Sequence, residues 1–453
     1  MKRYIGKSCR ITALALLLAV LLSGCISGSV SELYVLPKLP EDYQKLQKKI
    51  EEVLAQNSAE SAAPLTGELS QPVQLQDLDG DGVKEAIAFF RVTSDERPLK
   101  IYIYRQLGEE YEVAAVIEGA GSAINCVAYE NLGDTPAKEI VVSWQMSEKV
   151  YSLAAYSIAH DQVLELVRTD DYTDFRVFDL DMDNQKELIV LMAGETGGSS
   201  RVDLYNFHSV LELESSAMLS QNTTSPVENG MQTGYLKDHV PAVFVPSYYS
   251  ENGRITDIMA WRDGRIQNIT LDPETGESSS TVRWYNQVSG TDINGDGIME
   301  LPEPYALPDP KQTTTAVNFW ALRWRQFDIN GTPTTVFTTY HNERDGWYFI
   351  LPDQWEGKVC LSRSDQAGGS ERAVIFSYWE EGSGMEPEPF LVIYRLTGEN
   401  RERRADMAGR FRLYPPQGED NNVIYAGRLL DCSWDSGLTE ESVQAAFSLI
   451  SGS

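Results

Sequence analysis

The chain of 453 residues carries 38 Lys and Arg against 67 Asp and Glu, a formal net charge of −29, and 42% of its residues are hydrophobic. This length allows two or three folded units, and the apolar content is sufficient for real cores. The negative charge excludes a nucleic-acid partner, because phosphates require clustered basic residues, and four scattered histidines argue against a His-built metal or acid–base site.

The first 24 residues predict the signal peptide of a lipoprotein. A basic start is followed by an apolar run at 11–22, too short to span a bilayer comfortably. The tripeptide Leu-Ser-Gly ahead of Cys25 resembles a bacterial lipobox, which implies cleavage before Cys25 and lipidation of its thiol; an ordinary secretory leader with a stray cysteine is the alternative. Loss of the leader leaves 34 Lys and Arg against 67 acids, or −33. We therefore expect a monomer anchored by its N-terminus on the extracytoplasmic face of the cell membrane.

A tether and one helix are expected next, within a segment 25–64. Apolar residues recur at helical spacing over 41–56, directly after Pro40, and this pattern predicts an amphipathic helix that packs on the body of the protein. Attachment of this helix to the membrane surface is the alternative, but its apolar face is modest.

From residue 65 the pattern changes to pairs of apolar or alternating strands. The pairs are expected at 85–92 and 99–104, 139–144 and 150–156, 187–191 and 201–205, and 241–245 and 256–261. A polar loop precedes each first strand, and the loops begin near Asp77, Asn131, Asp179, Tyr235 and Asp292, at intervals of 48 to 57 residues. A period of about 50 residues built from short strands indicates a β-propeller or a similar array over 65–340. Five periods are visible, and 319–340 supplies strands for one more sheet, so the propeller has room for six or seven blades.

Three of these loops share an acidic pattern that predicts metal binding. Oxygen-bearing side chains stand at positions 1, 3 and 5, a residue tolerant of positive φ stands at position 6, the residue at position 7 offers its carbonyl, and a carboxylate stands at position 9. The expected ligands are Asp77, Asp79, Asp81, Val83 and Glu85 in loop 1; Asp179, Asp181, Asp183, Gln185 and Glu187 in loop 2; and Asp292, Asn294, Asp296, Ile298 and Glu300 in loop 3. Six to eight oxygens suit Ca²⁺, so we predict calcium as the cofactor.

Two alternatives explain the acidic loops less well. Ordinary acidic turns account for one such loop but poorly for three, because the crowded carboxylates repel one another without a cation. An EF-hand requires an exiting helix, which three prolines after loop 3 forbid. The loop at Asn131 has Gly133 and Thr135 where ligands should stand, and we expect no metal there or near Tyr235.

The pattern Asp-x-Asp-x-Asp-Gly-x-x-Glu before an apolar strand resembles the calcium loops of FG-GAP and VCBS-type repeats, found in integrin α-subunit propellers and many secreted bacterial proteins. The resemblance covers about residues 65 to 315. It implies a mainly β fold, a β-propeller with Ca²⁺ in hairpin loops, and ligands at the side-chain positions named above. Clear Phe-Gly and Gly-Ala-Pro signatures are absent.

The C-terminal region, 341–453, is expected to form a separate small α+β domain. Strands are predicted at 346–351, 358–362, 372–378, 389–394, 409–413 and 422–428, with a helix at 399–407 and a final helix reaching residue 450. Arg401, Arg403 and Arg404 form a basic cluster, interpreted as a solvated helix face. Cys360 and Cys432 are candidates for a disulfide, with Cys126 left as a buried thiol.

No motif of a nucleophilic, phosphate-binding or His-based metalloenzyme occurs. The sequence therefore predicts a non-catalytic, lipid-anchored protein of the cell envelope whose calcium-stabilised propeller binds a protein or a polysaccharide. Two alternatives stay open: an extracytoplasmic hydrolase acting on glycans, for which two carboxylates would suffice, and an assembly or sensor factor acting through the C-terminal region.

Overall fold

The computed structural model describes residues 41–159, 162–194, 199–227, 230–284, 288–310, 319–366, 369–415 and 422–450. The expected leader, Cys25 and the tether up to residue 40 lie outside these ranges, and so does His160. None of the helices in the described ranges has the length and apolar character that a membrane span requires.

The fold is mainly β, as predicted, and its strands form six antiparallel sheets that follow one another along the chain. Helix α2 (Glu41–Asn57) precedes them. Sheet 1 contains β1 (Glu60–Ser61), β2 (Val73–Gln76), β3 (Glu85–Arg91), β4 (Leu99–Leu107) and β5 (Glu110–Gly119). Sheet 2 contains β6 (Ala123–Glu130), β7 (Glu139–Gln145), β8 (Tyr151–Ala159) and β9 (Gln162–Asp170).

The middle of the chain forms two further sheets. Sheet 3 contains β10 (Tyr172–Phe178), β11 (Glu187–Met192), β12 (Arg201–Phe207) and β13 (Leu211–Met218). Sheet 4 contains β14 (Thr223–Pro226), β15 (Gln232–Tyr235), β16 (Pro241–Tyr249), β17 (Gly253–Arg262), β18 (Arg265–Asn268) and β19 (Arg283–Trp284). The short 3₁₀ helices η2 (Lys237–His239) and η3 (Ser279–Thr281) belong to its connections.

The last two sheets use the C-terminal region. Sheet 5 contains β20 (Leu301–Ala306), β21 (Trp320–Phe327), β22 (Pro333–Asn342), β23 (Trp347–Leu351) and β29 (Phe447–Leu449). Sheet 6 contains β24 (Val359–Gln366), β25 (Glu371–Tyr378), β26 (Glu388–Thr397), β27 (Phe411–Tyr414) and β28 (Val423–Leu429). The connections contain η4 (Asp353–Trp355), α3 (Arg401–Ala405) and α4 (Glu440–Ala446).

The eight strands predicted as four pairs are all present, as β3 and β4, β7 and β8, β11 and β12, and β16 and β17. These are the central strands of sheets 1 to 4. The first strand of each pair, β3, β7, β11 or β16, is nearly continuous in hydrophobic residues because both faces of the sheet are covered there. The outer strands, such as β9 and β13, are mostly exposed or half-buried and gave a weaker signal.

Neighbouring sheets pack face to face and share hydrophobic cores. One core joins sheets 1 and 2 around Phe89 and Trp144, and others join sheets 2 and 3, 3 and 4, and 4 and 5. The largest aromatic core, which includes Trp347 and Phe376, joins sheets 5 and 6. A β-bulge recurs between the last two strands of sheets 1, 2 and 3, next to Tyr104, Tyr156 and Tyr205. Such bulges increase strand twist, and they support a structural repeat.

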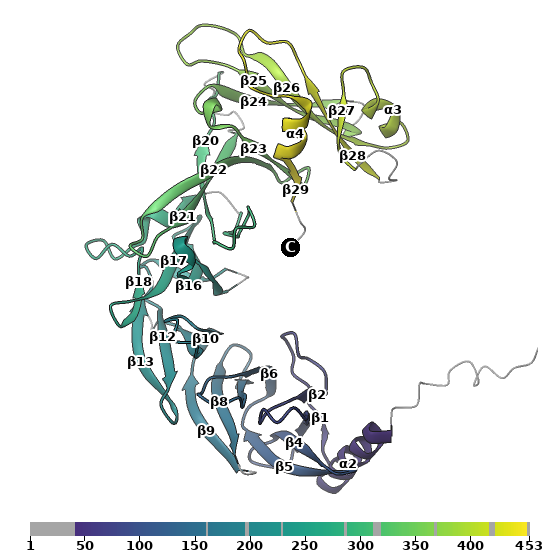
Figure 1. Ribbon diagram of the computed structural model, residues 1–453, viewed down its shortest axis with the longest axis vertical. Coiled ribbons are helices and arrows are strands. Elements are labelled where there is room, and N and C mark those ends of the chain that lie inside the picture. The colour runs from purple at the N-terminus through teal and green to yellow at the C-terminus, as the bar shows by residue number, and fades with distance from the viewer. Residues whose placement is uncertain are drawn as a thin grey trace, which may run out of the picture.

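The prediction of a closed propeller is not confirmed, because the six sheets follow an open arc in which sheets 1 and 6 stand at opposite ends (Figure 1). Each end face is covered by a helix instead of by another sheet. Leu46 of α2 packs on the free face of sheet 1, and Ala405 of α3 packs on the free face of sheet 6. Because both end faces are already buried, ring closure is not needed to remove them from water.

The C-terminal region continues the array. The expected boundary at 340/341 lies inside β22, and β22 pairs with β23, which pairs with β29 near the end of the described chain. The predicted final helix is wrong beyond residue 446, where β29 replaces it. Cys360 and Cys432 do not form the predicted disulfide: both are free thiols, and their sulfur atoms approach the carbonyl oxygens of Ser377 and Glu388. Cys126 is also free and only partly buried.

Candidate metal loops

Each of loops 1, 2 and 3 ends directly before a strand. Loop 1 joins β2 to β3, loop 2 joins β10 to β11, and loop 3 precedes β20. The first strands lie toward the inner side of the arc, while β5, β9 and β13 lie along its outer side (Figure 1). The repeated strand order therefore places the loops at repeated positions of the array.

All three loops share one hydrogen bond, and the Asn131 loop (131–139, between β6 and β7) shares it too. In each, the closing glutamate accepts a hydrogen bond from the backbone N–H at position 2. The bonds run from Leu78 to Glu85 (2.9 Å), from Leu132 to Glu139 (2.8 Å), from Leu180 to Glu187 (2.7 Å) and from Ile293 to Glu300 (3.0 Å). The position-9 glutamate thus fixes the loop frame with one oxygen and leaves the other for a further partner.

The turn itself is held by side-chain oxygens that accept backbone N–H groups. In loop 1, Asp77 accepts from Gly80 (2.9 Å) and Gly82 (3.0 Å), and loop 3 repeats this pattern. The backbone has positive φ at position 6, as predicted, and also at position 4, where Gly80, Met182 and Gly295 stand. The second positive φ was not predicted, although glycine at position 4 in two of the three loops was a signal for it.

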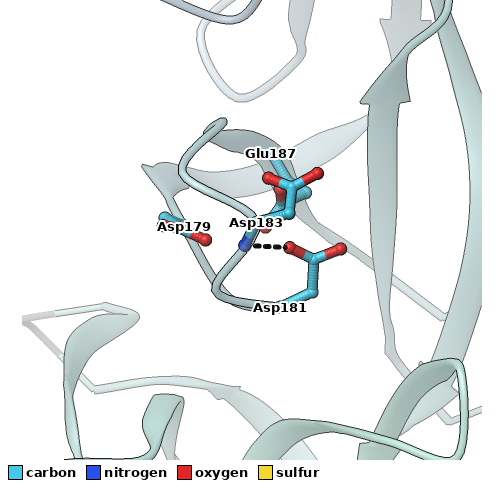
Figure 2. Close-up of side chains that lie close together, drawn as sticks. All are labelled: Asp179, Asp181, Asp183 and Glu187. Atoms are coloured by element: carbon cyan, nitrogen blue, oxygen red, sulfur yellow. Dashed lines mark hydrogen bonds between the residues drawn. The ribbon is translucent and has the colours of Figure 1, made fainter.

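Loop 2 brings together all four of its predicted carboxylates. Ligand oxygens of Asp179, Asp181, Asp183 and Glu187 lie within 4.8 Å of one another, and Figure 2 shows these side chains gathered around the turn. Glu187 is 0% exposed, and its Oε1 has no hydrogen-bond partner; the buried Oδ1 of Asp179 also has none. Burial raises the pKa of Glu187 to about 8, and the neighbouring Asp carboxylates act in the same direction. Buried acceptors without donors are costly, so this group fits a cation.

Loop 1 brings together three of its four predicted carboxylates, Asp77, Asp79 and Glu85. Asp81 is not part of this group, and its Oδ1 accepts a hydrogen bond from the Val83 backbone at 2.7 Å. Arg105 on β4 places Nη2 at 3.7 Å from Asp79 Oδ2. Burial raises the pKa of Glu85.

Loop 3 gathers Asp292, Asp296 and Glu300, and a neighbouring amide enters the group. Gln326 on β21 donates through Nε2 to Asp296 Oδ2 at 2.8 Å and to Glu300 Oε1 at 2.7 Å. The predicted ligand Asn294 donates to Asp296 at 3.0 Å. Sequence reasoning missed Gln326, because it lies on another strand and no local spacing connects it to the loop.

The Asn131 loop shows how the same frame is held without a carboxylate group. Asn131 donates through Nδ2 to the carbonyl oxygens of Thr135 and Ala137, the second at 2.8 Å. Thr135 and Ala137 stand at positions 5 and 7. The Asn131 amide therefore bonds position 1 to the far side of its own loop, whereas loops 1, 2 and 3 have a carboxylate at position 1. In the described ranges, the acidic groups that could hold a metal lie in loops 1, 2 and 3 and not in this loop or near Tyr235.

The loops also connect neighbouring sheets. The Lys138 backbone donates to Leu78 O at 2.8 Å, joining the Asn131 loop to loop 1. Gly80 has room only because it lacks a side chain, since a Cβ there would lie 2.7 Å from Pro136. The Met299 backbone donates to Tyr235 O at 2.9 Å and joins sheets 5 and 4. Order in these loops therefore affects how adjacent sheets are joined.

A separate cavity of about 420 Å³ opens between sheets 5 and 6. Tyr305 and Trp379 supply aromatic surface, and Glu356 and Glu381 supply carboxylates. Arg323 lies over the Tyr305 ring, 4.1 Å from its centroid, and forms an ion pair with Glu356. No sequence motif pointed to this cavity, since its residues come from four separate segments.

No family model and no curated protein matches the chain. Among solved structures, the exotype rhamnogalacturonan lyase YesX matches at 11% identity and a TM-score of 0.30, covering 73% of this chain and 74% of that one. The rhamnogalacturonan lyase PL11 of Bacillus licheniformis matches at 11% identity and a TM-score of 0.31, covering 70% and 75%.

This comparison corrects the predicted function. The prediction was a non-catalytic, lipid-anchored protein whose propeller binds a protein or a polysaccharide. Both matched structures are described as rhamnogalacturonan lyases, and on this finding the predicted non-catalytic function is withdrawn.

Proposed function

We propose that this chain binds calcium in loops 1, 2 and 3, as the resemblance to FG-GAP and VCBS-type repeats implies. The observation that carries the proposal is loop 2, where four carboxylates converge and two buried oxygens have no hydrogen-bond partner. A hard cation that takes oxygen ligands would satisfy both oxygens and cancel the mutual repulsion of the acids. Val83, Gln185 and Ile298 would add their backbone carbonyls.

Thermal unfolding with calcium, with magnesium and with a chelator tests this proposal. Calcium at 100 times its dissociation constant should stabilise the chain by about 2.7 kcal/mol per site. Asp181→Asn and Glu187→Gln should each reduce the calcium-dependent rise in Tm. Glu139→Gln is the matched control, because it changes the same position in the Asn131 loop and should keep the full response. Equal melting curves with calcium and with chelator would contradict the proposal.

A second candidate function is action on polysaccharide, supported by the cavity between sheets 5 and 6. Aromatic rings offer flat surface to the C–H faces of a sugar, and carboxylates can bond hydroxyl groups or transfer protons. The cavity combines Tyr305 and Trp379 with Glu356 and Glu381 in one place. Glycan cleavage by acid–base chemistry requires only two suitably placed carboxylates.

Incubation with a panel of neutral and acidic polysaccharides tests this function, with new reducing ends and unsaturated products as the readouts. Glu356→Gln and Glu381→Gln should each lower the rate at least 100-fold, in line with the usual contribution of a general acid or base. Glu343→Gln, an exposed acid outside the cavity, should leave the rate unchanged. If both cavity variants cleave polysaccharide as fast as the unmodified chain, the catalytic residues lie outside this cavity.

We propose further that Cys25 is lipidated and holds the chain at the cell membrane on its extracytoplasmic face. The support is the tripeptide Leu-Ser-Gly before Cys25, directly after an apolar run. Cys25→Ser in the full chain should move the protein from the membrane fraction to the soluble fraction. Cys126→Ser is the control and should leave the distribution unchanged.

A further inference from the structure

Sheet 4 contains a buried arginine that nothing in the described chain neutralises. Arg283 on β19 is 2% exposed, and its Nε and Nη2 atoms have no hydrogen-bond partner. None of the ion pairs within the described ranges includes it. Removing a guanidinium from water is costly unless an opposite charge compensates, and an apolar side chain could fill the same space. An anion beside Arg283 would supply the missing opposite charge.

A second arginine lies beside it. Arg254 on β17 stands directly opposite Arg283 in the antiparallel register, so the two side chains lie on the same face of sheet 4. Burial, followed by the charge of Arg254, lowers the pKa of Arg283 to about 10. Two like charges side by side repel each other, and an anion between them would remove both the repulsion and the cost of burial.

The register continues to an exposed aromatic residue. Tyr248 on β16 is opposite Arg254, whose guanidinium carbon lies 5.4 Å from the centroid of its ring. Exposure falls along this row: Tyr248 is 38% exposed, Arg254 is half-buried, and Arg283 is buried. The row therefore begins at the exposed ring of Tyr248 and ends at the buried guanidinium of Arg283.

We propose that the row Tyr248, Arg254 and Arg283 binds an acidic sugar residue, with its carboxylate held by the two guanidinium groups and its ring over Tyr248. A guanidinium matches a carboxylate through two parallel N–H donors, and an aromatic side chain next to it suits a sugar ring. The net charge of −29 does not prevent this, because repulsion beyond about 8 Å is screened at physiological salt. The choice of a sugar rests on the proposed action on polysaccharide, while the anion site rests on the arginines alone.

Binding to the full chain can be measured by calorimetry with an oligosaccharide of uronic acid residues, a neutral oligosaccharide of equal length, and inorganic phosphate. The acidic oligosaccharide should bind at least 10-fold more tightly than the neutral one. Arg283→Met and Arg254→Met should each weaken binding at least 10-fold, whereas Arg265→Met, an exposed arginine of the same sheet, should not. Without ligand, Arg283→Met should keep or raise Tm, because it removes an uncompensated buried charge.

Each other outcome has a defined meaning. The site is wrong if acidic and neutral oligosaccharides bind equally well. It is also wrong if Arg283→Met lowers Tm and leaves binding of the acidic oligosaccharide unchanged. Phosphate binding that is lost in Arg283→Met, with no oligosaccharide bound, supports the anion site and overturns its assignment to a sugar. If Arg283→Met turns over glycan with an unchanged KM, Arg283 does not bind the substrate and the proposed site is wrong, while the proposed action on polysaccharide still holds. Acidic oligosaccharide bound without turnover supports the site and counts against the function.

Discussion

In each loop of this repeat, the side chain at position 1 determines whether the loop has a donor for its own backbone carbonyls. At position 1, Asp77, Asp179 and Asp292 carry carboxylates, whereas Asn131 carries an amide whose Nδ2 donates to two backbone carbonyls. The closing glutamate and its bond to position 2 are the same in all four loops. The Asn131 loop also has Gly133 and Thr135 in place of the ligand residues at positions 3 and 5, so the amide is one of three differences from the other loops.

Asn131→Asp is predicted to destabilise the chain by about 1–3 kcal/mol, because a carboxylate would face two carbonyl oxygens and leave them without a donor. Chemical denaturation in the presence of a chelator measures this loss. Asn131→Ala, which removes the donor without adding a charge, should cost less. A free energy of unfolding for Asn131→Asp equal to that of the unmodified chain would contradict the role given to the amide.

A second residue-scale prediction concerns pH. His341 is stacked on Tyr348 at 5.0 Å and lies 5.8 Å from Trp324, and its Nε2 has no partner. Burial lowers the pKa of His341 to about 4 from its ordinary value of 6.5. Its contribution to stability is therefore complete above about pH 6.5 and is lost as pH falls toward 4, by roughly 3 kcal/mol at most.

His341→Phe should flatten this part of the pH dependence, because phenylalanine keeps the ring contacts and cannot be protonated. The measurement is the free energy of unfolding between pH 7 and pH 4 for both proteins. His208→Phe, outside this stack, should retain the slope of the unmodified chain. An unchanged slope in His341→Phe would show that other groups cause the loss.

At the residue scale, the spacing predicted which carboxylates of loop 2 lie together, but it missed the contribution of other strands. Spacing alone identified all the carboxylates of loop 2, because a nine-residue turn forces alternate side chains together. It failed for Asp81, which lies outside the carboxylate group of loop 1, and for Gln326, which another strand brings to loop 3. Arg283 was not singled out, since neither its burial nor its lack of partners is visible without the sheet.

At the scale of elements, the helix α2 acts as the cap of the first sheet. Leu46 is 3% exposed and packs in one cluster with Phe90, Tyr104 and Tyr111 of sheet 1. This agrees with the sequence prediction that the helix packs on the body of the protein. The cap is needed because the free face of sheet 1 is apolar and has no neighbouring sheet.

Leu46→Ala is predicted to lower the free energy of unfolding by 2–5 kcal/mol, the usual cost of removing a buried leucine side chain. Denaturant unfolding monitored by tryptophan fluorescence and by circular dichroism measures the loss. Lys48→Ala, an exposed position of the same helix, should change stability by less than about 0.5 kcal/mol. A similar small effect for Leu46→Ala would mean that α2 does not protect the sheet.

Element prediction succeeded where both faces of a strand are buried and weakened elsewhere. The apolar runs of β3, β7, β11 and β16 were unmistakable, while half-exposed edge strands such as β14 carry little pattern. The last predicted helix failed at its end, because Phe447 leaves the helix to pair with Phe349 of β23. That pairing spans about 100 residues of chain, and local periodicity contains no information about it.

At the scale of the whole molecule, the net charge of −29 sets the dependence on salt. Self-repulsion among 67 acids opposes a compact state, and dissolved ions screen it. We predict that Tm rises between low and physiological ionic strength of sodium chloride. Calcium at matched ionic strength should raise Tm further, which separates binding from screening. A Tm independent of sodium chloride would contradict a destabilising role of the overall charge.

The closed ring was the part of the whole-molecule prediction that failed. A period of about 50 residues predicts repeated sheets, but a ring and an arc have the same period and differ in what covers the end faces. Helices α2 and α3 cover those faces here, and neither helix carries a local signal that distinguishes a cap from a surface helix.

Capped ends have a consequence for how such a molecule changes in evolution. In a closed ring, adding or losing one repeat requires every remaining interface to adopt a new angle. In this arc, a repeat inserted between two sheets makes the same two interfaces as its neighbours, and the helices at the ends need not change. Relatives of this chain should therefore differ in the number of sheets while retaining the two end helices, and the reach of the arc should vary with repeat number.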